Sequence, residues 1–235
     1  MYSQRIWWAF IPYFAVSVVH VWTRFMEDPL AAPTKLLLMP FLALAVVVSI
    51  SGVRGVAWRV AALLLVGLVL SWLGDGAGTF FPWFSDELPM MLVCFGLAHL
   101  CYMALFWWGR VETQARLPKL WWGYVPVYVA IVAILAPRAG AFALPIAAYG
   151  VVLVGTAVLA MRLGAIVGWG GFWFLVSDAV LAFRIFTPEW MPAWTGGVVM
   201  LTYTLGQLLI AYGVTKRMMV TSAGAAHEEK LTELS

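Results

Sequence analysis

Long apolar runs separated by short polar breaks dominate the hydrophobic pattern of this chain. Eight of these runs have about the 17–25 residues that a membrane-spanning helix needs. The breaks between them contain turn formers, such as Glu27-Asp28-Pro29 and Thr187-Pro188-Glu189. The pattern therefore predicts an all-α polytopic membrane protein, a bundle of eight transmembrane helices over residues 6–22, 34–50, 57–75, 88–107, 120–136, 141–161, 165–186 and 193–214.

Composition narrows the class further. Of the 235 residues, 64% are hydrophobic and 11% are charged, whereas soluble domains carry about 25% charged residues. This excludes an ordinary soluble protein and a disordered one. The net charge of +3 is small and dispersed, so we expect no nucleic-acid partner. We expect one transmembrane domain over residues 1–216 and a polar C-terminal tail over 217–235, which frays or projects as a short helix.

The distribution of basic residues predicts how the bundle is oriented. With eight spans, both termini lie on one side, and that side carries most of the Lys and Arg residues. The opposite side carries only Arg24, Lys35, Arg138 and Arg184. By the positive-inside rule both termini are therefore expected in the cytoplasm. Tryptophans near the predicted helix ends suit an aromatic belt: Trp7, Trp8, Trp22, Trp58, Trp107, Trp108, Trp121, Trp122, Trp190 and Trp194.

Two acidic residues remain once those of the loops and the tail are set aside. Asp75 closes the third predicted helix, and Asp178 lies inside the seventh. A charged carboxylate at mid-helix costs about 2.5–3.5 kcal/mol on insertion scales, so such residues usually face a bundle interior and mark function. The simpler interpretation is a hydrogen bond or salt bridge that only joins helices.

Other polar side chains lie at compatible depths in the predicted spans. They predict a polar pocket inside the bundle that opens toward the non-cytoplasmic side. Simpler roles are open to each: a cation can snorkel to the interface, and a histidine can sit among headgroups or in a satisfied core position. The candidates for binding or supporting a substrate are Lys35, His99, Tyr102, Arg184, Tyr203 and Gln207, with His20 at the end of the first span.

The residue types in this pocket favour acid–base chemistry. Within an apolar pocket, one buried carboxyl group can hold a proton while a nearby cation keeps a second one ionised. A three-histidine zinc site is not expected because only His20 and His99 lie in the spans, although a mixed His/Asp site stays open. Cys94 and Cys101, about 10 Å apart along one helix, suit packing rather than a disulfide.

Several short motifs resemble those of the YhhN-type lysoplasmalogenases. The N-terminal half carries Thr34-Lys35-Leu36-Leu37-Leu38-Met39-Pro40, Leu73-Gly74-Asp75 and Gly96-Leu97-Ala98-His99-Leu100-Cys101-Tyr102. The C-terminal half carries Ser177-Asp178 within 174–186, and Tyr203-Thr204-Leu205-Gly206-Gln207-Leu208-Leu209. The resemblance spans about residues 30–213. One departure is Gly76-Ala77-Gly78, where a bulkier apolar continuation is expected.

The resemblance implies an eight-helix membrane hydrolase that cleaves the vinyl ether bond of lysoplasmalogens to a fatty aldehyde and a glycerophospho-alcohol. The family's membrane carboxylates correspond to Asp75 and Asp178, and its other polar motif positions to Lys35, His99 and Tyr102. It implies no organic cofactor and no metal. The expected partners are a lysophospholipid substrate and membrane lipids, with the oligomeric state open, and the expected location is the bacterial cytoplasmic membrane.

The chemistry of a vinyl ether assigns expected roles. We expect Asp178 to be the general acid, because it is predicted to lie deeper and to be better desolvated. Asp75 is then the base, kept ionised by Lys35, while His99 and Tyr102 position water or the headgroup; the two carboxylates can also exchange roles. A small-molecule, lipid or proton-coupled transporter would use the same carboxylates as a proton relay, and a non-catalytic scaffold would use them only to join helices.

Overall fold

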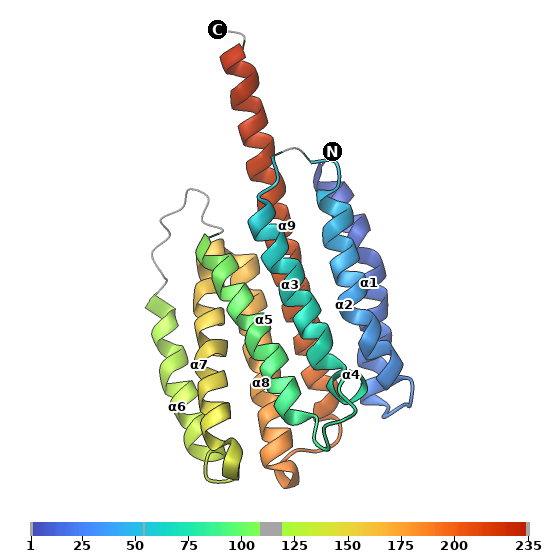
Figure 1. The fold of residues 1–235 in the computed structure, drawn as a ribbon, viewed down its shortest axis with the longest axis vertical. Helices are drawn as coiled ribbons and strands as arrows, with labels where there is room; N and C mark the ends of the chain where they lie inside the picture. Colours follow the sequence, from blue (N-terminus) through green and yellow to red (C-terminus); the bar gives the residue numbers. More distant parts are fainter. Residues whose placement is uncertain (1, 54, 109–118, 234–235) are drawn as a thin grey trace.

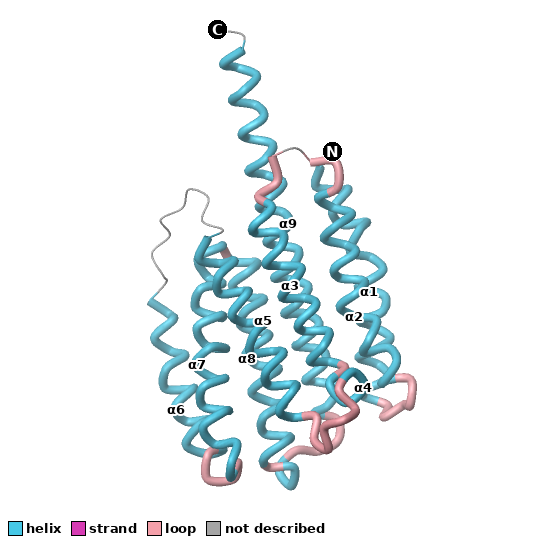
Figure 2. The backbone as a smooth tube through the Cα atoms, viewed as in Figure 1, coloured by secondary structure: helices cyan, strands magenta, loops and turns pink. Residues whose placement is uncertain are grey.

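The computed structural model describes residues 2–53, 55–108 and 119–233, and the regular structure of these residues is entirely helical (Figure 1). Short loops and 3₁₀ turns join the helices (Figure 2). The helices are α1 (Tyr2–Phe25), α2 (Ala31–Ile50), α3 (Trp58–Asp75), α4 (Ala77–Phe80), α5 (Leu88–Trp108), α6 (Tyr124–Leu135), α7 (Ala143–Ala160), α8 (Ala165–Phe186) and α9 (Thr195–Glu233).

Seven stretches of the described chain are helical, long and apolar enough to cross a membrane. The expected span at 120–136 is different, because α6 has only 12 residues and follows a 3₁₀ turn, Lys119–Gly123. Twelve residues of α-helix rise about 18 Å, less than the roughly 30 Å of a bilayer core. Pro126, which cannot donate a backbone hydrogen bond, lies in the first turn of α6. The protein is therefore an integral membrane protein, and the count of eight spans stays a prediction.

The helices run antiparallel to their chain neighbours. Helix α9 packs against α8, α1 and α2, whereas α6 packs mainly against α7 at one side of the bundle. Helix α1 begins and α9 ends at the same end of the bundle (Figure 1). Which side of the membrane this end faces remains the expectation drawn from the basic residues.

Glycines allow the central helices to approach one another closely. A Cβ atom on Gly170 of α8 would lie 2.8 Å from the backbone nitrogen of Ile210 in α9. Gly206 of α9 faces α8, and a Cβ atom placed on it would lie 2.8 Å from the backbone nitrogen of Phe174. Small residues at such crossings bring the backbones into van der Waals contact, which drives helix association in lipid. Gly170 and Gly206 therefore mark a close crossing of α8 and α9.

Tryptophans of the expected belt lie on the outer surface near helix ends. Those whose side chains the structure describes are at least half exposed, which suits indole rings placed in the membrane interface. The side chain of Trp121 lies outside the described ones. The exposed belt residues are Trp7, Trp8, Trp22, Trp58, Trp107, Trp108, Trp122, Trp190 and Trp194.

The last helix continues well past its predicted end at residue 214. Helix α9 runs from Thr195 to Glu233 without interruption, and its final part projects beyond the bundle (Figure 1). The residues from Thr215 onward include many good helix formers, with Gly224 as their only glycine and no proline. The expected tail therefore projects as the end of α9 rather than as a separate short helix.

Candidate active site

A cavity of about 920 Å³ lies within the bundle. Its wall comes from the beginnings of α2, α5 and α9, the end of α3, the second half of α8, and from α6 and α7. The structure brings five of the sequence-predicted site residues to this wall. They are Lys35, Asp75, Asp178, Arg184 and Tyr203.

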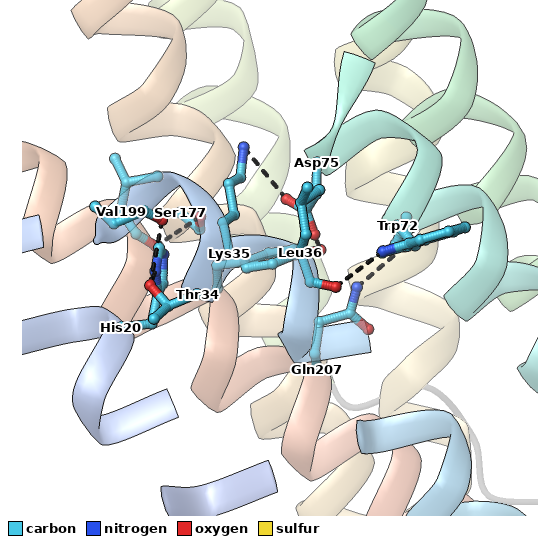
Figure 3. Close-up of polar contacts among 12 residues, drawn as sticks. His20, Thr34, Lys35, Leu36, Trp72, Asp75, Ser177, Val199 and Gln207 are labelled. Atoms are coloured by element: carbon cyan, nitrogen blue, oxygen red, sulfur yellow. Dashed lines mark hydrogen bonds and ion pairs between the residues drawn. The ribbon is translucent and has the colours of Figure 1, made fainter. Parts of the chain in front are cut away.

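Asp75 is held by a cation and a hydroxyl from two other helices. The Lys35 Nζ atom lies 3.5 Å from Asp75 Oδ1, and the Tyr203 hydroxyl donates a hydrogen bond of 2.7 Å to Oδ2. Figure 3 shows the Lys35 side chain extending from α2 toward Asp75 at the end of α3. The Asp75 side chain is 2% exposed and that of Lys35 is 31% exposed. The carboxylate is thus buried with both oxygens engaged, while its counterion still reaches water.

The local sequence explains why Asp75 ends its helix. One turn earlier the Trp72 indole N–H donates a hydrogen bond of 2.9 Å to the backbone oxygen of Leu36, which fixes α3 against α2 (Figure 3). A Cβ atom on Gly76 would lie 2.4 Å from the Phe80 ring and 2.8 Å from the Leu36 side chain. Glycine is needed there so that the chain can turn into α4. The departure at Gly76-Ala77-Gly78 therefore allows the short α4 turn to follow Asp75.

Asp178 has different partners. The Tyr149 hydroxyl of α7 donates a hydrogen bond to Asp178 Oδ2, and the His99 Nε2 atom of α5 lies 3.6 Å from the same oxygen. His99 is fully buried, and neither of its ring nitrogens has a hydrogen-bond partner in the described structure. Within that structure, no Lys or Arg forms an ion pair with Asp178. Sequence analysis missed Tyr149, although it is the sole tyrosine of the predicted span 141–161.

The expectation that Asp178 is better desolvated than Asp75 is wrong. The Asp178 side chain is 10% exposed, compared with 2% for Asp75. Asp75 is the more enclosed group because Lys35 and Tyr203 cover its two oxygens. The proposed acid role of Asp178 therefore cannot rest on greater burial, and the neighbours of each carboxyl group must be compared instead.

The two carboxylates form one site. Both line the same cavity. Phe174 of α8 separates their partners. Its ring centre is 5.4 Å from that of Tyr203 and 4.6 Å from that of His99. Phe174 thus packs between a partner of Asp75 and a partner of Asp178.

Three of the candidate residues lie behind the cavity wall. His99, Tyr102 and Gln207 are fully buried and do not line the cavity. The Tyr102 hydroxyl donates a hydrogen bond of 2.9 Å to Gln207 Oε1, and Gln207 Nε2 donates one of 3.1 Å to the Ser71 hydroxyl. This network joins α5, α9 and α3 beneath Asp75. Tyr102 and Gln207 therefore support the wall and do not reach the cavity.

We expect Tyr102→Phe to lower stability more than activity. The substitution leaves the buried Gln207 oxygen without its donor, which costs about 1–3 kcal/mol. Thermal unfolding in detergent, followed by tryptophan fluorescence, measures the loss. Tyr212→Phe is the matched control, because the Tyr212 hydroxyl makes no hydrogen bond to a described residue. Equal melting temperatures for the two variants would contradict this structural role of Tyr102.

The remaining cations and histidines have defined places. The Arg184 Nη1 group donates hydrogen bonds to the carbonyl oxygens of Pro192 and Ala193 and to the hydroxyl of Thr195. His20 is fully buried, and its Nδ1 atom lies 2.9 Å from the Thr34 hydroxyl. The headgroup position considered for His20 is therefore wrong, because α2 packs over it.

Cysteine and metal chemistry were also considered from the sequence. Cys94 and Cys101 are free thiols on α5. Among the described side chains, no three His, Cys, Asp or Glu residues are grouped so that they could hold a metal ion.

Comparison with known proteins places the chain in a family. The family model of the YhhN family matches residues 30–214, which include both carboxylates and all their partners. The chain belongs to the YhhN family. It is also similar to a human protein named lysoplasmalogenase TMEM86B, with 32% identity over 148 residues. That alignment covers 63% of this chain and 61% of the human protein, so the chain spans less than two thirds of that relative. No solved structure matches this chain significantly.

Proposed function

We propose that this YhhN-family chain is a membrane hydrolase that cleaves the vinyl ether bond of lysoplasmalogens. The family membership and the name of the human relative support this class of reaction. The observation that carries the mechanism is a pair of carboxyl groups on one cavity, with a cation beside only one of them. We further propose that the bundle crosses the bacterial cytoplasmic membrane eight times, with both termini in the cytoplasm.

The neighbours of each carboxyl group suggest its role. Lys35 and the Tyr203 hydroxyl both favour the ionised form of Asp75. Each carboxyl group accepts one tyrosine hydrogen bond, so the difference between them is the cation: Asp178 lacks an arginine or lysine partner among the described residues. Asp178 is thus the general acid and Asp75 the base. This division resembles other enzymes in which two carboxyl groups are driven to opposite protonation states.

The reaction then proceeds by proton transfer to carbon. The Asp178 carboxyl gives its proton to the β-carbon of the vinyl ether, and the double-bond electrons form the new C–H bond. The α-carbon becomes an oxocarbenium ion, which the Asp75 carboxylate stabilises electrostatically. Asp75 takes a proton from a water molecule as its oxygen attacks that carbon, which gives a hemiacetal.

Collapse of the hemiacetal restores both groups. Asp178, now a carboxylate, takes the proton from the hemiacetal hydroxyl as the carbonyl of the aldehyde forms. Asp75 returns its proton to the departing glycerol oxygen. The products are a fatty aldehyde and a glycerophospho-alcohol, and each carboxyl group ends in its starting state. His99 contacts Asp178 from behind and is therefore a positioning residue in this scheme.

The rest of the cavity suits a single hydrocarbon chain. Its wall away from the carboxyl groups is mainly aliphatic, with contributions from α6, α7 and α8. Each buried methylene of a substrate chain contributes about 0.8 kcal/mol. The apolar residues concerned are Val127, Ile131, Val132, Leu135, Ile146, Leu153, Val154 and Leu175.

We expect Val132→Phe to shift the chain-length preference toward shorter substrates. The larger ring displaces about two methylenes of a long chain, which corresponds to roughly a tenfold fall in kcat/KM. Rates are measured for long-chain and short-chain lysoplasmenyl lipids. Val129→Phe is the matched control, because Val129 lies on the same helix, is 56% exposed and does not line the cavity. A parallel loss for both chain lengths would contradict this placement of the chain.

Aldehyde release from a pure lipid tests the proposed function directly. Protein purified in detergent is given a lysoplasmenyl phospholipid, with the saturated 1-O-alkyl analogue as control because it has no double bond to protonate. We expect a fatty aldehyde from the first lipid and none from the second. No aldehyde from either lipid, together with lipid- or proton-dependent uptake into proteoliposomes, would instead favour a transporter.

A further inference from the structure

Two arginines meet at the edge of the cavity. A Cβ atom placed on Gly196 of α9 would lie 2.8 Å from Arg24 Nη2 and 3.3 Å from Arg184 Nη2. Both guanidinium groups therefore lie beside the same point, Arg24 from the last turn of α1 and Arg184 from the last turn of α8. Both residues also line the cavity. The missing side chain of Gly196 provides the room in which they converge.

No described carboxylate neutralises this pair. The ion pairs of the described residues are Lys35 with Asp75 and His99 with Asp178, and neither includes an arginine of the pair. The Nη1 group of Arg184 already donates to oxygens of residues 192–195. Arg24 makes no hydrogen bond to a described residue. Two like charges that lie this close repel each other and are stabilised by an anion between them.

The backbone N–H groups beside the two arginines are not free to bind an anion. The N–H groups of Thr195, Gly196 and Gly197 are bonded to the oxygens of Pro192, Ala193 and Trp194 in the preceding turn. An anion here is therefore recognised by guanidinium groups. Their planar forks match the oxygens of phosphate in two-point contacts.

The spacing along α8 matches the length of a glycerophospholipid. Asp178 and Arg184 are six residues apart, a rise of about 9 Å. In a lysoplasmalogen, seven bonds separate the protonated β-carbon from phosphorus, about 8 Å in extended form at roughly 1.2 Å per bond. A phosphate held at the arginines therefore puts the vinyl ether at about the level of Asp178 along α8.

We propose that Arg24 and Arg184 form a phosphate subsite that holds the phosphodiester of a single-chain glycerophospholipid and sets its register against Asp178. The identity of the lipid rests on the proposed function. Arg24 lies on α1. This part of the site is therefore outside the residues matched by the family model, 30–214.

A binding experiment separates the subsite from the reaction. The full-length Asp178→Asn protein is titrated with an uncleavable 1-O-alkyl lysophospholipid and with the 1-O-alkylglycerol of the same chain, which lacks phosphate. We expect the lysophospholipid to bind about 10- to 100-fold more tightly. Arg24→Gln and Arg184→Gln should each remove most of this difference and leave alkylglycerol binding unchanged. Because no bond is cleaved, a failure here differs from a failure of hydrolysis.

Controls distinguish charge, folding and the source of the phosphate. Arg138→Gln should change neither affinity, because Arg138 stacks over Trp190 and does not line the cavity. If Arg184→Gln unfolds, Arg24→Gln and Arg184→Lys carry the test. Equal affinity of the Asp178→Asn protein with both arginines intact for both lipids, or an equal loss for both lipids in the arginine variants, would overturn the proposal. Inorganic phosphate that binds as tightly as the lysophospholipid would overturn the lipid assignment.

Discussion

Replacing Asp178 with asparagine is expected to lower the rate of aldehyde release about 10³-fold. An amide cannot transfer a proton to carbon, and general acid catalysis contributes typically 10²–10⁴-fold. The asparagine oxygen can still accept the hydrogen bond from Tyr149, so the wall of the cavity is retained. The loss should therefore appear in kcat, with KM for the lysoplasmenyl lipid nearly unchanged, in a continuous assay of aldehyde formation.

Asp86→Asn is the matched control for this substitution. Asp86 lines the same cavity, and its side chain accepts a hydrogen bond of 2.9 Å from the backbone N–H of Leu88. Asparagine is an equally good acceptor at such a position. The control removes one carboxylate from the cavity without removing a proposed proton donor, and we expect it to keep near wild-type activity.

The proton transfer has a chemical signature. In D₂O, protonation of the β-carbon places one deuterium at C2 of the aldehyde. If Asp178→Asn keeps most of the activity and Asp75→Asn does not, Asp178 is neither the acid nor the base. If both variants stay active, carboxylate catalysis is wrong altogether.

The scarcity of charge made the main site residues predictable from sequence. Asp75 and Asp178 were identified because all other acidic residues fall in loops or the tail. Lys35 and Tyr203 followed from their depth in the spans, and the structure places both beside Asp75. The relative burial of the two carboxyl groups was not predictable, because it depends on which helices cover each one.

Two residues that line the cavity, Tyr149 and Arg24, were missed for different reasons. Tyr149 contributes a single polar side-chain atom, its hydroxyl oxygen, to the long apolar helix α7. Only the packing of α7 on α8 brings this hydroxyl to Asp178. Arg24 was assigned to orientation, because an arginine at a helix end normally snorkels to the interface. Its position close to Arg184 depends on the space beside Gly196, far away in the sequence.

The fold was predictable where long apolar runs coincide with helices. The ends of α2, α3, α5 and α8 fall within a few residues of the predicted bounds. The prediction was least accurate at 120–136, where the α-helix begins only at Tyr124, and at the C-terminus, where α9 continues through polar residues. A hydropathy pattern detects burial in lipid and does not detect where a helix continues into water.

Removing the cation beside Asp75 is expected to have the second largest effect. Lys35→Gln leaves a carboxylate that is 2% exposed without its counterion, and breaking such a buried pair from one side costs about 3–5 kcal/mol. We expect the melting temperature to fall by roughly 6–20 °C. Aldehyde release should fall about 10²-fold or more, because Asp75 then favours its protonated form and cannot act as the base.

Asp75→Asn should lower activity strongly and stability only a little. It removes the base and so lowers activity by a similar factor, but the Lys35 ammonium, already 31% exposed, can turn toward water. The Tyr203 hydroxyl keeps an oxygen acceptor in the asparagine. Stability should therefore fall less than in Lys35→Gln. The double variant should recover much of the stability lost in Lys35→Gln because no unpaired charge remains buried.

Activity should not return in the double variant, and this separation is the decisive observation. A pair that only joins α2 to α3 would let stability and activity recover together. A catalytic carboxylate kept ionised by Lys35 would restore the melting temperature and leave aldehyde release absent. Measuring both quantities on the same four proteins, wild type included, therefore distinguishes a structural ion pair from a base with its counterion.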